Sequence, residues 1–215
     1  MKGVSAVISS AILLAMPISA ASKPHVVAFG KWTTINLQAD DDTDTQNVKM
    51  RALLVDAKAK EFTVGPAHDI TDHTFAIQQI FRLNDSLPRE AGPTRWRWEK
   101  GGWVVVDRVS GRVQPIALPG FDPYYSQVSW FRDYVAYCGS SDDGQKVFAV
   151  IVQAGKRRPL LKKALAEKIE NCPAPIWQRG PVRVTFATKE DPKQTFTVTS
   201  RAVDLATEDE SEGEE

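Results

Sequence analysis

Apolar and polar residues alternate in paired short segments along most of this chain. Residues 51–64 form one such pair, two apolar runs with a polar turn between them, and residues 103–116 repeat the pattern. Further copies cover residues 147–160 and, more faintly, 195–205. Alternation with a period of two sends every second side chain to one face of a sheet, so each pair predicts a β-hairpin.

A tryptophan stands ahead of two of the expected strands. Val128-Ser-Trp130 precedes Asp133-Tyr-Val-Ala-Tyr137, and Pro175-Ile-Trp177 precedes Pro181-Val-Arg-Val-Thr-Phe186. In both cases a short turn separates the tryptophan from a strand of alternating β-branched and aromatic residues. The chain also holds six Trp and nine Phe, so the sequence predicts an all-β protein with an aromatic core.

The segment 159–171 departs from this pattern. Leu161, Leu165 and Ile169 recur at intervals of four, with Lys and Glu residues between them. This spacing predicts an amphipathic helix of about three turns that begins at a proline. We expect the helix to pack against a sheet edge; the alternative is a basic helix that binds a partner.

Four short motifs carry a resemblance to a known family. They are Leu118-Pro-Gly-Phe-Asp122, Val128-Ser-Trp130, Tyr134-Val-Ala-Tyr137 and the turn Asp143-Gly144. Together they resemble the blade repeat of TolB-like β-propellers, a unit that is also similar to the blades of prolyl-oligopeptidase propellers. The resemblance is best over residues 118–200 and implies a binding or scaffolding surface, without transferring any catalytic residue.

The spacing of the hairpins agrees with this resemblance, because they begin roughly 45 to 50 residues apart, as propeller blades do. We therefore expect a propeller-like array of about four antiparallel sheet units, with one short helix near 159–171. A four-bladed ring, an open array and a distorted sandwich are all open alternatives.

The two ends of the chain differ from its body. Residues 1–21 combine Lys2, an uncharged and mostly apolar run and a small-residue end, which predicts a cleaved signal peptide. An uncleaved anchor helix is the alternative. Residues 22–206 then form one domain, and residues 207–215 form a disordered acidic tail. The protein is expected to be secreted, periplasmic or extracellular, with no stable membrane span after cleavage.

Charge is distributed unevenly although the formal net charge is zero. Six of the 27 acidic residues lie at 208–215, so 21 remain in the body against 26 bases once Lys2 is removed. The body is therefore mildly basic. This modest charge and the expected export argue against a nucleic-acid partner, and the acidic tail is either solvated or a loose shield for the basic surface.

Cys138 and Cys172 are the two cysteines of the chain. In an exported protein an even pair predicts a disulfide, and two buried thiols are the alternative. Two isolated cysteines without a nearby histidine do not supply the four ligands of a structural zinc site.

Two acidic segments are candidates for cation binding. His68, Asp69 and His73 lie within six residues and offer imidazole and carboxylate ligands for a transition metal. The alternative is a polar loop with a capping carboxylate. Asp40 to Asp44 offers carboxylates for calcium but does not fit the EF-hand pattern. We predict no cofactor.

The segment Arg95-Trp-Arg-Trp-Glu-Lys-Gly-Gly-Trp103 gathers three tryptophans. On a strand Trp96 and Trp98 share one face, while Arg95 and Arg97 share the other. The three tryptophans, Trp96, Trp98 and Trp103, are candidate ligand-binding residues, since exposed indoles stack on sugar rings and other flat ligands. Burial between sheets is the alternative.

No catalytic group is predicted. The chain lacks a Gly-x-Ser-x-Gly elbow, and no nucleophile, base and orienting acid can be paired from the sequence. We therefore expect a noncatalytic binding or scaffolding protein of the bacterial cell envelope, with a protein or glycan partner. A carbohydrate-binding or carbohydrate-active protein that uses exposed tryptophans is the alternative, and self-association through unpaired blades is a third hypothesis.

Overall fold

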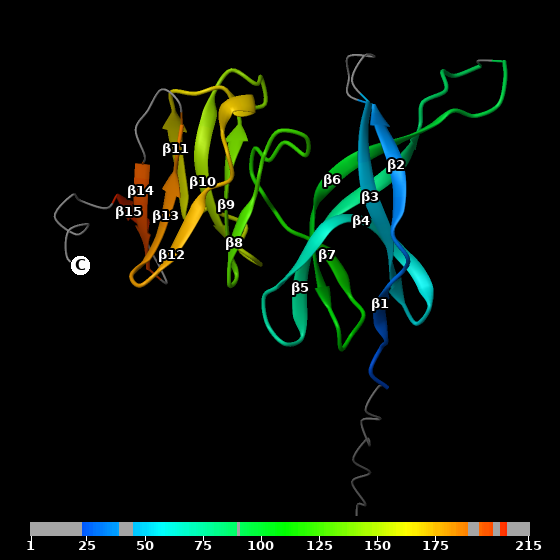
Figure 1. The fold of residues 1–215 in the computed structure, drawn as a ribbon, viewed down its shortest axis with the longest axis horizontal. Helices are drawn as coiled ribbons and strands as arrows, with labels where there is room; N and C mark the ends of the chain where they lie inside the picture. The colour runs from blue at the N-terminus through cyan, green and yellow to red at the C-terminus, as the bar shows by residue number, and fades with distance from the viewer. Residues whose placement is uncertain (1–22, 39–44, 90, 189–193, 200–202, 206–215) are drawn as a thin grey trace, which may run out of the picture.

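The computed structural model describes residues 23–38, 45–89, 91–188, 194–199 and 203–205. These residues form three antiparallel β-sheets, which confirms the all-β class (Figure 1). Within this part of the chain, the helical structure consists of one 3-10 turn, η1 (Ile169–Asn171). The predicted signal peptide, the acidic residues 40–44 and the acidic segment 207–215 lie outside the described residues.

The first sheet, sheet A, contains seven strands in the order β1-β3-β4-β5-β6-β7, with β2 also paired to β3. The hairpins predicted at 51–64 and 103–116 are present as β3–β4 and β6–β7. The seven strands are β1 (Val27–Phe29), β2 (Thr33–Gln38), β3 (Thr45–Val55), β4 (Lys58–Asp69), β5 (Thr74–Asn84), β6 (Trp96–Asp107) and β7 (Val113–Pro115).

Sheet A is strongly curled because three of its strand pairs contain bulges or irregularities in register. A bulge bends its strand and increases the local twist. The curl brings β2 close to β6, and two small apolar cores form on opposite faces of the sheet. One core contains Leu37, Met50, Val64 and Ile80, and the other contains Leu53, Phe75, Ile77, Val104 and Val106.

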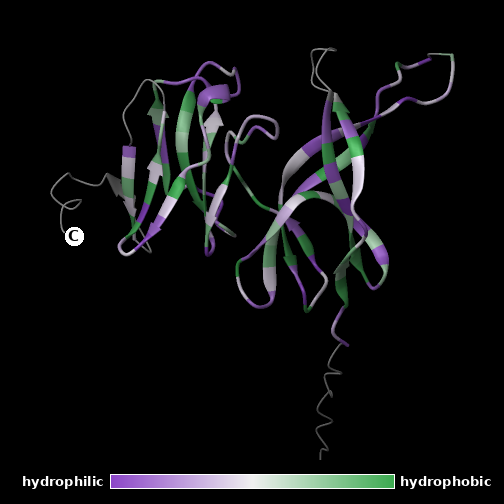
Figure 2. Cartoon of the chain, in the orientation of Figure 1, coloured by the Kyte–Doolittle hydropathy of each residue, from purple (hydrophilic) through white to green (hydrophobic). Residues whose placement is uncertain are grey.

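Sheets B and C are two four-stranded meanders whose strands follow one another in chain order. Apolar and polar positions alternate along the two central strands of sheet C, whereas the two central strands of sheet B are buried along most of their length (Figure 2). The predicted hairpin at 195–205 is present as β14–β15. Of the hairpin predicted at 147–160, the first strand is present as β10, but its partner strand begins at Leu161, beyond the predicted bounds. Sheet B contains β8 (Ser129–Phe131), β9 (Tyr134–Ser140), β10 (Val147–Gln153) and β11 (Leu161–Leu165); sheet C contains β12 (Ile176–Arg179), β13 (Val182–Phe186), β14 (Gln194–Val198) and β15 (Val203–Leu205).

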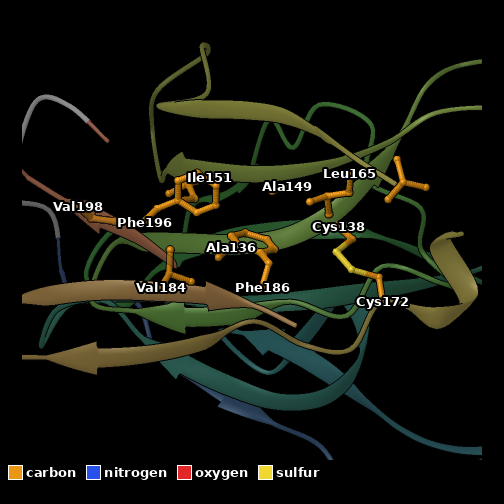
Figure 3. Close-up of a cluster of buried hydrophobic side chains, with 11 residues drawn as sticks. Ala136, Cys138, Ala149, Ile151, Leu165, Cys172, Val184, Phe186, Phe196 and Val198 are labelled. Atoms are coloured by element: carbon orange, nitrogen blue, oxygen red, sulfur yellow. A yellow bond between two sulfur atoms is a disulfide. The ribbon is translucent and has the colours of Figure 1, made fainter. Parts of the chain in front are cut away.

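The largest core lies between sheets B and C, where side chains of the two sheets point toward one another (Figure 3). Cys138 of β9 and Cys172, just after η1, are buried in this core and form a disulfide. The predicted disulfide is thus confirmed, and it ties sheet B to the segment that leads into sheet C. The core residues include Ala136, Ala149, Ile151 and Leu165 from sheet B and Val184, Phe186, Phe196 and Val198 from sheet C.

The prediction of a helix over 159–171 is wrong. Residues 161–165 form β11, which pairs with β10 from Leu161 opposite Ile151 to Leu165 opposite Val147. The physical reason is that a spacing of four residues fits two periods, since it places side chains on one face of a helix and also on one face of a strand. In the folded chain these residues pair with the edge of β10, and this pairing favours the strand over the helix.

The array of about four sheet units also requires correction. The two N-terminal hairpins do not form separate units, because both belong to the seven-stranded sheet A. The described residues therefore form three sheets, and they contain no propeller. Among these same residues, no helix is long and apolar enough to span a membrane.

Candidate functional site at the junction of sheets A and B

The linker between β7 and β8 fills the junction of sheets A and B. Leu118, Phe121 and Val128 pack together with Trp130 against buried residues of both sheets. The Tyr137 hydroxyl donates a hydrogen bond to the carbonyl oxygen of Pro119 at 2.9 Å, and burial raises the pKa of Tyr137. The motif Leu118-Pro-Gly-Phe-Asp122 is therefore a packed part of the junction.

Gly120 allows this linker to approach β9 closely. Its backbone has φ +69, and its carbonyl oxygen accepts a hydrogen bond from the Ser140 amide at 2.7 Å. A Cβ atom at this position would lie 2.3 Å from the Ser140 carbonyl oxygen. Both the left-handed conformation and the close approach require glycine here.

Trp130 of β8 is the central aromatic residue of the junction. Its ring lies 5.2 Å from the His68 imidazole in a stacked arrangement, and 5.4 Å from the Trp103 ring. The imidazole Nε2–H of His68 donates to the carbonyl oxygen of Arg132 at 2.7 Å. A side chain of β4 in sheet A thus fixes the β8–β9 turn of sheet B.

A cleft of about 1080 Å³ lies at this junction. Its sheet A wall includes Ile70, Val105 and Ile116, with polar groups from Thr71, Thr74 and Gln114. Its sheet B wall consists of two turns, Arg132-Asp133 between β8 and β9, and Ala154 to Arg157 between β10 and β11. The cleft therefore combines an apolar floor with a polar rim, as ligand sites commonly do.

The rim of the cleft is basic. Arg132, Lys156 and Arg157 line it and are exposed, whereas Asp133 is its one acidic lining residue. The Asp133 carboxylate already accepts a hydrogen bond from the side-chain amide of Gln153 at 2.8 Å. No carboxylate in the described ranges forms an ion pair with the three bases. Cations without a carboxylate partner can pair with an anionic ligand, and Arg can do so with two parallel hydrogen bonds.

The structure does not bring His68, Asp69 and His73 together. His68 contacts Trp130 and Arg132, and the Asp69 carboxylate instead pairs with Arg108 at 2.6 Å. The backbone carbonyl of His73 accepts from the Arg108 amide at 2.7 Å. In the described part of the chain, no group of three or more His, Cys, Asp or Glu residues is placed to hold a metal ion. A metal site at these residues has no geometric support.

The three candidate tryptophans lie on one face of β6, but in different surroundings. Trp103 is 8% exposed and packs at the junction of the sheets. Trp98 is half-buried against the Phe62 ring, at 5.3 Å. Trp96 is 53% exposed, and the Arg82 guanidinium lies 5.3 Å from its ring and 5.6 Å from that of Trp98. Trp96 is thus the most accessible of the three.

The basic rim was not among the residues predicted as a site. Arg132 lies two residues after Trp130, and Lys156-Arg157-Arg158 is a run of three basic residues. The sequence contained this signal, but the two turns are neighbours only because both lie at the same end of sheet B.

Comparison with known proteins gives no relative for this chain: no protein-family model, curated protein or solved structure matches it. Its function is therefore inferred from its own sequence and structure.

Proposed function

We propose that this protein is a noncatalytic binding module of the bacterial cell envelope, and that it holds an anionic part of its partner in the cleft between sheets A and B. The observation that carries this proposal is the set of three bases, Arg132, Lys156 and Arg157, that line the cleft without a carboxylate partner in the described ranges. The partner is a protein or a glycan with carboxylate or phosphate groups.

The construction of the junction supports a site that is formed before the ligand arrives. The bond between His68 and the Arg132 carbonyl fixes one turn of the rim. The amide of Ala154 donates to the Asp133 carbonyl oxygen at 2.7 Å, which fixes the second turn relative to the first. A preformed site avoids the entropic cost of ordering loops on binding.

The resemblance of residues 118–200 to TolB-like propellers concerns sheets B and C, and it supports this proposal. Each is a four-stranded meander with a tryptophan in its first strand, so we interpret them as two degenerate propeller-type blades. Such blades usually supply binding surfaces at their turns, which is where the basic rim lies.

Two features support an exported location. Residues 1–21 have the composition of a secretory signal, and a disulfide persists in oxidising compartments. A periplasmic or extracellular location is consistent with both. It also favours an envelope polymer or protein over nucleic acid as the source of the anionic groups.

The proposal is tested with a fluorescent octaglutamate peptide and with polygalacturonate as anionic probes. We expect both to bind the full chain and to dissociate when salt rises from about 0.05 M to about 0.5 M. Arg132→Glu with Arg157→Glu should weaken binding by more than about tenfold. Lys58→Glu with Lys60→Glu, at exposed positions of β4 away from the cleft, is the matched control. Equal loss in both double variants would show nonspecific charge attraction and contradict the site.

A second candidate function is carbohydrate binding at the outer end of β6. It is favoured by the exposure of Trp96 and by the Arg82 guanidinium that lies against both Trp96 and Trp98. An exposed indole beside a guanidinium can stack on a sugar ring and donate hydrogen bonds to its hydroxyls.

Glycan-array binding tests this candidate. We expect a signal that Trp96→Ala abolishes and Trp32→Ala retains, since Trp32 is also an exposed tryptophan beside an arginine, Arg51. A signal that survives Trp96→Ala would exclude this face as the sugar site.

A further inference from the structure

We infer that the acidic segment 207–215 binds intramolecularly to a basic strip on sheet B, and that it thereby competes with anionic partners for the junction cleft. The basic strip consists of Lys156, Arg157, Arg158, Lys162 and Lys163, which belong to the β10–β11 turn and to β11.

The five side chains of the basic strip lie at the surface, where the Lys162 and Lys163 ammonium groups lie over the rings of Phe148 and Phe196. All five residues are exposed, and β11 is the edge strand of sheet B. None of the five forms an ion pair with a carboxylate of the residues that the structure describes. Five bases within eight residues repel one another, so an acidic occupant would relieve this repulsion.

The acidic segment leaves the described structure next to this strip. Leu205, at the end of β15, pairs with Phe196 of β14. The Lys163 ammonium lies 5.5 Å from the centre of the Phe196 ring. Directly paired strand residues have Cα atoms about 5 Å apart, and the Phe ring lies a similar distance from its own Cα, so the chain departs from Leu205 within roughly 15 Å of the Lys163 ammonium.

The length and charge of the segment fit the strip. Residues 206–215 span at most about 33 Å when extended, whereas the distance along β11 and its turn from Lys163 back to Lys156 is about 24 Å in extended chain. Residues 208–215 hold six carboxylates and no base. A tethered segment acts at millimolar effective concentration, so even a weak charge contact is populated.

The competition follows from two shared residues. Lys156 and Arg157 belong to the basic strip and also line the junction cleft. An acidic segment bound to them lowers the positive potential at the rim. An external anionic partner would then have to displace it, which lowers the apparent affinity and makes binding selective for partners with several negative charges.

Backbone amide NMR shifts of the full chain and of a variant lacking residues 207–215 test the contact without any external ligand. We expect differences confined to the basic strip and its neighbours, equal at dilute and tenfold higher protein concentration, and absent at about 0.5 M salt. A length-matched variant, in which the six acids are replaced by Ser and Gln, should reproduce the spectrum of the shortened chain.

Lys162→Glu with Lys163→Glu should remove the differences, whereas Lys58→Glu with Lys60→Glu should retain them. Identical spectra of the full and shortened chains would overturn the inference, and differences that grow with protein concentration would do so by showing contact between copies. The cleft is tested separately, because Lys162 and Lys163 do not line it. If the contact is present, the shortened chain should bind octaglutamate about fivefold more tightly.

Discussion

Trp130 and Trp177 occupy equivalent positions in sheets B and C. Each lies in the first strand of its sheet and pairs with a buried valine of the second strand, Val135 or Val184. Each indole packs toward the preceding sheet: Trp130 against His68 and Trp103, and Trp177 against Phe131 and Tyr134 of sheet B. The two sheets are thus stacked by one repeated contact.

Among the described residues, the outer face of sheet C lacks the aromatic pair that Trp177 packs against on sheet B. Phe131 and Tyr134 are paired neighbours on sheet B, and the corresponding pair on sheet C is Gln178 and Arg183. A polar pair replaces the aromatic one, so this face cannot seat a further tryptophan in the same way. Polar outer faces are typical of the terminal units of stacked repeats.

The two tryptophans differ in hydrogen bonding, which gives a first prediction. Trp177 donates its Nε1–H to the Ser129 carbonyl oxygen at 3.1 Å, whereas the Nε1–H of Trp130 is buried without an acceptor among the described residues. Trp177→Phe should therefore lower the free energy of unfolding by about 1 kcal/mol more than Trp130→Phe does. Urea unfolding of both variants measures the difference, and equal losses would contradict these roles.

His68 gives a second prediction. His68→Phe keeps a ring on Trp130 but removes the donor to Arg132, so we expect a loss of about 1 kcal/mol in unfolding free energy. Because Arg132 lines the cleft, octaglutamate should also bind more weakly. His73→Phe, at an exposed position on the adjoining turn, is the control. A change in stability without any change in affinity would show that His68 does not position the rim.

Gly120 gives a third prediction, with Gly144 as its match. Both glycines have nearly the same φ, +69 and +70, but only at Gly120 would a Cβ meet another atom within 4 Å. Gly144→Ala should cost about 1 kcal/mol for the backbone conformation, and Gly120→Ala should cost at least about 2 kcal/mol more because of the Ser140 carbonyl. Thermal unfolding compares the two variants. Similar melting temperatures would show that the linker can move away from β9.

A fourth prediction concerns alkaline pH. Burial raises the pKa of Tyr137 above its ordinary value of 10.0, so above about pH 10 the unfolded chain loses a proton that the folded chain keeps. The free energy of unfolding should then fall with rising pH, by up to about 1.4 kcal/mol per pH unit. Below about pH 10 the Tyr137 hydroxyl keeps its proton in both the folded and the unfolded chain, so its titration does not change the free energy of unfolding.

Tyr137→Phe removes this contribution, so its stability difference from the parent chain should shrink as pH rises through 10. Denaturant titrations at neutral pH and above pH 10 compare the two chains. A constant difference between the Tyr137→Phe variant and the parent chain would contradict the assigned pKa shift.

Local structure was predictable wherever a single sequence period applied. Three of the four predicted hairpins are present, as is the disulfide between Cys138 and Cys172. The strand at 161–165 was not predicted because the spacing of Leu161 and Leu165 fits either a helix or a strand. Its pairing with the edge of β10 is a tertiary contact that the local sequence does not show. Local spacing cannot decide such a case.

The candidate site was not predictable from the sequence for a related reason. Thr71, Arg132 and Lys156 lie far apart in the sequence and meet only through the curl of sheet A and the stacking of sheet B on it. The bulges that produce the curl leave no clear mark on the alternation of apolar residues. Trp103 was read as a ligand-binding candidate for the same reason, because its burial depends on Trp130 of the next sheet.

Chemical-shift mapping of octaglutamate binding tests most directly the claim that the cleft between sheets A and B holds an anionic ligand. The expected result is a set of saturable changes at amides of both walls together, at Thr71 and Thr74 of sheet A and at Arg132 and Gly155 of sheet B. These changes should be lost in Arg132→Glu with Arg157→Glu. Changes confined to one wall, or spread over all exposed lysines of the chain, would contradict the claim.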